Sequence, residues 1–319
     1  MPDWKKVLEQ IAVEQVKQTE SAFDHVRRRY LTRLHRHTGR NVIAYYSGFL
    51  SKPRIEGIEI TDDDKNAFML CIHELDRTKG LDLILHTPGG SVAATESLVV
   101  YLRAMFGSDI RAIIPQIAMS AGTMLSCSCK EIVMAKHSSL GPVDPHFNGI
   151  PAVGVLEEIK KAFEQIKADP VYAQVWGPVL SRLTPSFVQQ CEWAVERSKE
   201  FVGEALGQNM FNGLPAREKS RKINKVKREL TDLSANKGHD RHFHIDDCRN
   251  MGLNVLALED SPEFQDLVLT VHHCYMHTLT NTPAFKIIEN QMGKAHVRQA
   301  QMALMQGPMA MSFGPGSPT

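Results

Sequence analysis

Leu-Asp-Leu-Ile-Leu-His-Thr-Pro-Gly-Gly-Ser, residues 81–91, is the stretch that decides the fold of this chain. Residues 81–86 are mostly apolar, which is typical of a strand buried on both faces of a sheet. Pro88, Gly89 and Gly90 then end the strand in a tight turn. The stretch therefore predicts a central strand whose C-terminal end carries a glycine-rich loop.

The residues that follow repeat this pattern of strand, turn and helix. A helix is predicted from 91 to 106, a second strand over 110–115, a serine turn at 118–123 that opens another helix, and a third strand over 132–135. Strands that alternate with helices favour an α/β fold with a mostly parallel sheet. Right-handed crossovers would bring the glycine turn and the serine turn to the same edge of that sheet.

The N-terminal flank reads as a helix from about residue 3 to 36 and a strand over 41–48. The helix is basic between residues 27 and 40, where no acid occurs. We interpret this run as a solvated helix face or a subunit contact, with an anionic-ligand patch as the alternative.

Beyond Pro145 the chain is predicted to be largely helical. Helices are expected over 153–166, 187–210, 264–279 and 284–305. The basic run at 217–228 predicts an exposed helix rather than a nucleic-acid site, because no aromatic residues interleave with its charges.

Composition is that of an ordinary globular protein. Of 319 residues, 43% are apolar and 23% charged, and 37 basic against 36 acidic residues give a net charge of +1, so charge indicates no nucleic-acid or membrane partner. Six scattered cysteines suit reduced thiols. No targeting segment and no apolar run of about 18 residues is visible, so we expect a soluble, cytoplasmic protein with no membrane span.

Ser120 is the candidate nucleophile. It stands where a strand-end loop enters a helix, and the small residues Ala121 and Gly122 leave its hydroxyl uncovered. The backbone N–H groups of Gly90 and Ala121 could together form an oxyanion hole. An ordinary helix N-cap is the alternative interpretation of this serine.

Three motifs carry a family resemblance: residues 86–91 (His-Thr-Pro-Gly-Gly-Ser), 118–123 (Ala-Met-Ser-Ala-Gly-Thr) and 139–145 (Ser-Leu-Gly-Pro-Val-Asp-Pro). In this order and spacing they resemble the Clp/crotonase superfamily, and within it the serine dehydrogenase proteinase family. The resemblance implies a spiral of ββα units with a mostly parallel sheet, a serine nucleophile and multimeric assembly. It assigns Ser120 as the nucleophile and Gly89, Gly90 and Ala121 to the oxyanion-hole segment.

This resemblance also suggests a domain organisation. Residues 41–258 would form the Clp/crotonase-like catalytic domain, with a helical insertion at about 150–235. Residues 1–40 would be an N-terminal helical extension, 259–305 C-terminal helices, and 306–319 a disordered tail.

The sequence alone does not identify the general base. Clp-type peptidases use a histidine about 25 residues after the serine, and here that region ends at Pro145, with His146 just past it. The related signal-peptide-peptidase branch uses a lysine 40–50 residues downstream, where Lys160, Lys161 and Lys167 occur on a predicted amphipathic helix. A buried lysine with a lowered pKa could deprotonate a serine.

A third source of the base is the segment before Gly252, which resembles the Clp segment that carries the triad aspartate. His239 and Asp240 fall there, so either could take part in a relay. His239, His242 and His244 could instead hold a metal, but we predict no metal site. His273 and His277 lie four apart on a helix without a glutamate between them, and we interpret them as packing or surface residues.

The sequence therefore predicts a serine peptidase that forms an acyl-enzyme on Ser120 and acts on peptides or proteins. We expect a homo-oligomer, with any partner protein or ATPase left open. A catalytically silent scaffold and a crotonase-type acyl-CoA enzyme are the alternatives. No cofactor is expected, since no GxGxxG motif follows a strand.

Overall fold

A seven-stranded sheet runs through the centre of the computed structural model, which describes residues 4–15, 21–147, 149–231 and 241–300. The strand order is β11-β10-β1-β2-β3-β5-β9. Five neighbouring strands are parallel: β1 (Asn41–Ser47), β2 (Leu81–His86), β3 (Ile110–Ile114), β5 (Glu131–Met134) and β9 (Val255–Ala257). The predicted α/β fold with a mostly parallel sheet is confirmed.

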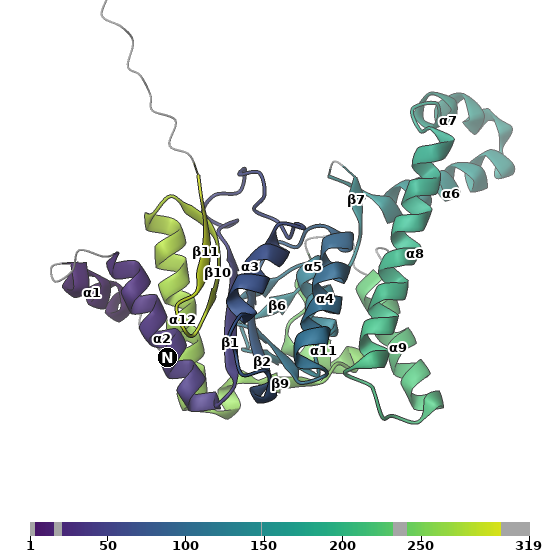
Figure 1. The fold of residues 1–319 in the computed structure, drawn as a ribbon. Helices are drawn as coiled ribbons and strands as arrows, with labels where there is room; N and C mark the ends of the chain where they lie inside the picture. The colour runs from purple at the N-terminus through teal and green to yellow at the C-terminus, as the bar shows by residue number, and fades with distance from the viewer. Residues whose placement is uncertain (1–3, 16–20, 148, 232–240, 301–319) are drawn as a thin grey trace, which may run out of the picture.

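Helices cover both faces of this sheet, and each face has its own apolar core (Figure 1). Alternate residues of β1 supply the two cores, Ile43 and Tyr45 on one side, Val42 and Ala44 on the other, as the period of two in a strand requires. The first face is covered by α3 (Asp64–Ile72), α4 (Val92–Phe106), α5 (Ala121–Cys127), α8 (Pro185–Gln208), α9 (Ala216–Thr231) and α11 (Ile245–Met251). The second is covered by α1 (Trp4–Gln15), α2 (Ala22–Thr38) and α12 (Pro262–Asn281).

The helix predicted over residues 284–305 is wrong for the residues that the structure describes. They form a hairpin of β10 (Ala284–Asn290) and β11 (Ala295–Gln299), and β10 pairs antiparallel with β1. The sequence Ala-Phe-Lys-Ile-Ile-Glu-Asn places two charged residues where an amphipathic helix would expose them, yet the whole of β10 is buried.

Buried ion pairs explain why β10 tolerates those charges. Lys286 Nζ lies 2.9 Å from Asp64 Oδ1. Glu289 accepts from Arg27 and, at 2.8 Å, from Arg28 Nε. Arg27 and Glu289 are fully buried, so the interpretation of the basic run of α2 as a solvated face is wrong at Arg27.

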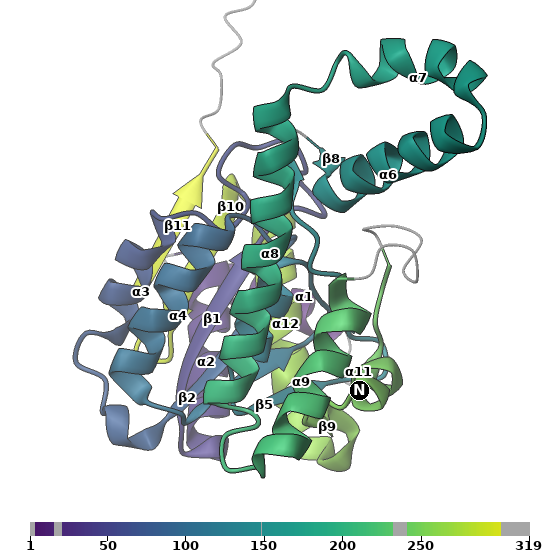
Figure 2. The ribbon, with the colours of Figure 1, turned by 90° about the vertical axis from the view of Figure 1, so that its right-hand side faces the viewer.

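An arm extends away from the sheet (Figure 2). It consists of α6 (Ala152–Ala168), the short helix η2 (Pro170–Tyr172), α7 (Ala173–Leu180) and the first turns of α8. A small separate core of Ala152, Val155 and Cys191 joins α6 to α8.

Short elements complete the fold. They are η1 (Arg77–Lys79), η3 (Leu258–Asp260), the parallel pair β4 (Ile117–Ala118) and β6 (Ser139–Leu140), and the antiparallel pair β7 (His146–Phe147) and β8 (Ile150–Pro151). Among the described helices, none combines the length and apolar character needed to cross a bilayer.

Candidate active site

The glycine turn and the serine turn meet at the C-terminal edge of the parallel strands. Thr87, directly after β2, donates its N–H to Ile117 O at 3.2 Å, and its own carbonyl accepts from Met119 N at 3.0 Å. These two bonds hold the segment before Ser120 alongside the start of the glycine turn. Ligands of open parallel sheets bind at this edge.

Ser120 has a strained backbone. Its φ of 49° and ψ of −109° lie in a region that residues with a Cβ avoid, and the helix α5 begins at the next residue. Ser120 Oγ makes no hydrogen bond to any described residue and does not cap α5. By contrast, Ser91 caps α4 by accepting from Ala94 N at 3.2 Å. Ser120 thus occupies the N-cap position of α5, but its side chain does not act as a cap.

Gly89 packs directly against the serine turn. Its φ is 106°, and a Cβ added there would lie 2.8 Å from Ser120 Cβ and 2.9 Å from Met119 O. Gly90 is held from its other side by Ile60, whose N–H donates to Gly89 O at 2.8 Å and whose carbonyl accepts from Ser91 N at 2.9 Å. Only glycines allow so close an approach of three backbone segments.

Two N–H groups beside Ser120 remain open. Within the described ranges, neither Gly90 N nor Ala121 N donates a hydrogen bond to another residue, whereas Gly89 N already donates to Thr87 Oγ1 at 3.1 Å. Ala121 is the first residue of α5, so its N–H also carries the partial positive charge of a helix N-terminus. An oxygen that develops negative charge near Ser120 could accept from both open groups.

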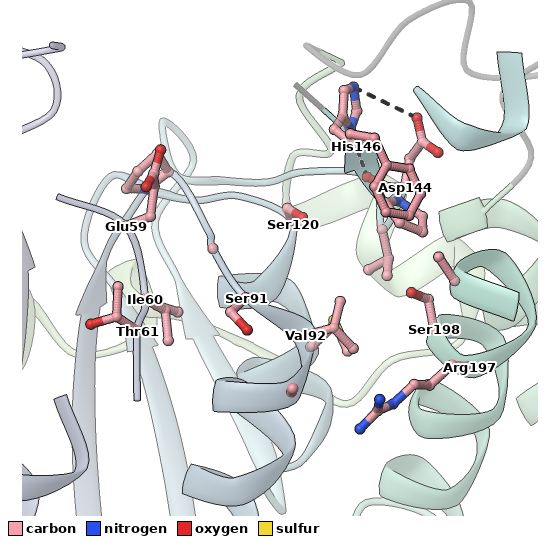
Figure 3. A pocket seen from close by; sticks show the side chains of 18 of the residues that line it. Glu59, Ile60, Thr61, Ser91, Val92, Ser120, Asp144, His146, Arg197 and Ser198 are labelled. Atoms are coloured by element: carbon pink, nitrogen blue, oxygen red, sulfur yellow. Dashed lines mark hydrogen bonds and ion pairs between the residues drawn. The ribbon is translucent and has the colours of Figure 1, made fainter. Parts of the chain in front are cut away.

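A cavity of about 890 Å³ opens in front of these groups (Figure 3). One wall is formed by the glycine turn and residues 59–61, and the facing wall by α8. It is lined by Glu59, Ile60, Thr61, Pro88, Gly90, Ser91, Val92, Ala93, Ser120, Met124, Val143, Asp144, Pro145, His146, Phe147, Gly149, Trp193, Ala194, Arg197 and Ser198.

Asp144 and His146 lie together on the rim of the cavity (Figure 3). His146 Nδ1 is 2.9 Å from Asp144 O, and His146 Nε2 is 3.9 Å from Asp144 Oδ2. The Asp144 side chain is only 1% exposed. Burial raises the pKa of its carboxyl to about 6, against the lowering effects of His146 and of a hydrogen bond with the Val153 backbone.

Comparison with known proteins settles the family. Residues 10–300 match the family described as ClpP-like SDH-type serine proteinase. The chain belongs to this family. Two uncharacterised proteins of Methanocaldococcus jannaschii are 29% and 26% identical to it over 196 residues, 61% of this chain. The chain spans about 60% of the length of these curated relatives.

A solved structure, a membrane-bound stomatin-specific protease in complex with a substrate peptide, is 17% identical to this chain. The match covers 67% of this chain and 93% of that one, with a TM-score of 0.28.

The predicted lysine bases lie away from the cavity. Lys161 and Lys167, like Lys160, are exposed on α6, and none of them lines the cavity. His239 and Asp240 lie outside the described residues. Among the described residues, the candidates for the general base that line the cavity are therefore Glu59, Asp144 and His146.

Other histidines have structural partners. His242 Nδ1 is 2.7 Å from Ser139 Oγ, and His244 Nδ1 is 3.1 Å from Ser138 O. His273 and His277 pack against the ring of Trp4. No group of three metal-ligating side chains is found in the part of the chain that the structure describes.

Sequence reasoning did not single out Asp144 as a site residue. The sequence did offer one indication. Asp144 lies between Pro142 and Pro145, 24 residues after Ser120, in a motif that carries the family resemblance. Its burial beside the cavity comes from packing that the sequence does not display.

Proposed function

We propose that this chain is a serine peptidase that cleaves peptide bonds through an acyl-enzyme on Ser120. The observation that carries the proposal is the strained, unbonded serine at a cavity beside two open N–H groups. Family membership supports the reaction class.

In the proposed reaction, Ser120 Oγ attacks the scissile carbonyl carbon while a base takes the hydroxyl proton. The oxyanion that forms accepts hydrogen bonds from Gly90 N–H and Ala121 N–H. Collapse of this intermediate expels the amine, which takes the proton from the base. Water then hydrolyses the ester, releases the acid and restores Ser120.

We assign the base to His146. In the tautomer that donates from Nδ1 to Asp144 O, its Nε2 is the proton-accepting nitrogen. The Asp144 carboxylate, 3.9 Å from Nε2, would stabilise the imidazolium that forms. No hydrogen bond joins His146 to Ser120 among the described contacts, so substrate binding has to bring the two side chains together. Catalytic hydrogen bonds commonly tighten only when substrate is bound.

The proposal extends to assembly and location. The arm carries exposed apolar side chains, including Phe163, Val175 and Trp193, which supports a homo-oligomer that buries them. All six cysteines are free and buried, which supports a reducing compartment such as the cytoplasm. The substrate is a peptide or protein.

Steady-state hydrolysis of a peptide library tests the function and the base together. Ser120→Ala should abolish cleavage. His146→Gln should lower kcat/KM by about 100-fold or more, as expected for loss of a general base. Lys161→Met is the matched control and should stay within about twofold of wild type, since an exposed surface side chain contributes little.

Cleavage that survives Ser120→Ala would contradict the proposed function. Loss of activity in Lys161→Met with retention in His146→Gln would keep the nucleophile and overturn the assignment of the base.

A further inference from the structure

Ser198 has an unexplained buried hydroxyl in the cavity wall opposite Ser120 (Figure 3). The residue is 1% exposed and lies in the middle of α8. Its Oγ has no hydrogen-bond partner among the described residues. A buried hydroxyl without a partner costs free energy, so it indicates a group that is supplied from outside the chain.

Other hydroxyls inside helices of this chain behave differently. Several donate to the carbonyl four residues earlier, which is the usual local partner of a serine or threonine in a helix, and others, such as Thr32 and Thr123, bond a carbonyl elsewhere in the chain. Ser126 bonds Gly122 O and Ser128 bonds Met124 O, each at 2.8 Å, and Thr278 bonds Cys274 O at 2.8 Å. Ser198 does not bond the carbonyl of Ala194, and its hydroxyl faces the cavity instead.

Ser198 shares its cavity with apolar side chains and with the nucleophile. Val92, Met124 and Val143 line the same cavity. Met124 is one helical turn after Ser120 on α5, so this part of the cavity begins next to the reacting serine. A substrate held by the two open N–H groups would direct its acyl-side (P1) side chain into it.

Of the described residues that α8 contributes to the cavity, only Arg197 carries a charge. Arg197, the next residue on α8, is engaged by Glu96, with Nε 3.0 Å from Oε1. The Asp144 carboxylate points toward His146 rather than toward Ser198 (Figure 3). A charged P1 side chain would therefore lose its hydration without gaining an ion pair.

We infer that Ser198 is the polar end of the P1 subsite and selects an uncharged side chain that ends in a carboxamide, glutamine or asparagine. A hydroxyl can donate to the carboxamide oxygen and accept from its N–H, while the apolar walls contact the methylene groups. This inference rests on the proposed peptidase function and names its substrate class.

Peptides that differ only at P1, glutamine against methionine of similar length, test the inference. Wild type should cleave the glutamine peptide with a kcat/KM about fivefold higher, the gain expected from one neutral hydrogen bond. Ser198→Ala should lose this preference. Thr61→Val removes another unpaired cavity hydroxyl, on the far side of the glycine turn, and should keep it (Figure 3).

A wild type that prefers methionine, or a ratio unchanged by Ser198→Ala, would overturn the inference while Ser120-dependent cleavage stands. Absence of any Ser120-dependent cleavage would instead overturn the proposed function, and this inference with it.

Discussion

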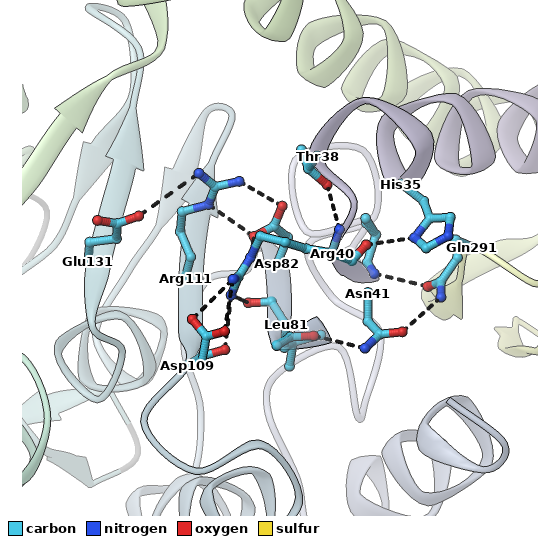
Figure 4. A network of polar contacts seen from close by, with 12 residues as sticks. His35, Thr38, Arg40, Asn41, Leu81, Asp82, Asp109, Arg111, Glu131 and Gln291 are labelled. Atoms are coloured by element: carbon cyan, nitrogen blue, oxygen red, sulfur yellow. Dashed lines mark hydrogen bonds and ion pairs between the residues drawn. The ribbon is translucent and has the colours of Figure 1, made fainter. Parts of the chain in front are cut away.

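Strand β2 carries a fully buried polar side chain near each end, Asp82 and His86, and the two differ in their hydrogen bonding. Asp82 accepts from Arg40 Nε at 2.7 Å and from Arg111 Nη2 at 2.8 Å (Figure 4). His86 has no hydrogen-bond partner for either ring nitrogen within the described residues, and its ring packs against the rings of Tyr46, Phe49 and His272.

The same contrast holds for the edges of the sheet at which these residues lie. At the N-terminal edge, Arg40 also donates to both Asp109 carboxylate oxygens at 3.0 Å, so the charges are compensated. At the C-terminal edge lie a strained serine and two open N–H groups, and the cavity in front of them is lined by Ser198, whose hydroxyl has no partner among the described residues. Satisfied polar groups stabilise and orient strands, whereas unsatisfied ones that line a cavity are available to a substrate.

Removing Asp82 should have the largest effect on stability. Asp82→Ala leaves two half-buried guanidinium groups without their shared carboxylate, and we expect the free energy of unfolding to fall by about 3–5 kcal/mol. Urea unfolding measures this loss. Asp109→Ala is the matched control, because that side chain is 47% exposed and should cost only about 1 kcal/mol. A loss below that of the control would break the contrast between the two edges.

A side chain at Gly89 should act on the reaction rather than on the fold. In Gly89→Ala the new Cβ would contact Ser120 Cβ and Met119 O, displacing the serine from the open N–H groups, so kcat/KM should fall by about 100-fold or more. Gly107→Ala also adds a Cβ at a residue with a positive φ, 62°, but no atom lies within 4 Å of that new Cβ. This control should show mild destabilisation and wild-type kinetics; equal kinetics in both variants would contradict the account.

Replacing His86 should have the smallest effect of the three, a small increase in the free energy of unfolding. Burial lowers the pKa of His86 from its ordinary 6.5 to about 3. Between these values the unfolded chain binds a proton that the folded chain excludes, so the free energy of unfolding decreases as pH falls below 6.5. His86→Phe removes the group that binds this proton, together with its two ring nitrogens that lack partners among the described residues.

We therefore expect His86→Phe to be about 1 kcal/mol more stable than wild type at pH 7, with a shallower loss of stability toward acid pH. Thermal unfolding across this pH range measures both. His73→Phe alters an exposed histidine and should keep the wild-type slope. A destabilised His86→Phe with an unchanged slope would show that the His86 nitrogens do have partners.

The sequence predicts much of the site at the C-terminal edge of the parallel strands, but it does not predict the hairpin strand β10. Apolar strands that end in small-residue turns place Gly89, Gly90 and Ser120 together, because parallel strands end at one edge. The hairpin strand β10 is missed because its buried charges find partners 222 and 262 residues away, at Asp64 and Arg27. Such pairs leave no local pattern.

Parts of the cavity wall are missed for a related reason. Ser198 lies on a helix with an ordinary amphipathic sequence, and only the approach of α8 to α5 turns its hydroxyl toward the cavity. Asp144 is a buried carboxyl only because of tertiary packing, which its local sequence does not reveal.

Covalent labelling tests the central claim, that the open edge of the sheet holds an activated serine, most directly. Wild-type protein treated with a fluorophosphonate should gain one adduct, mapped by peptide mass spectrometry to Ser120 and absent in Ser120→Ala. Ser91 and Ser198, which line the same cavity, should stay unmodified. No adduct on wild type, or equal labelling of wild type and Ser120→Ala, would contradict the account.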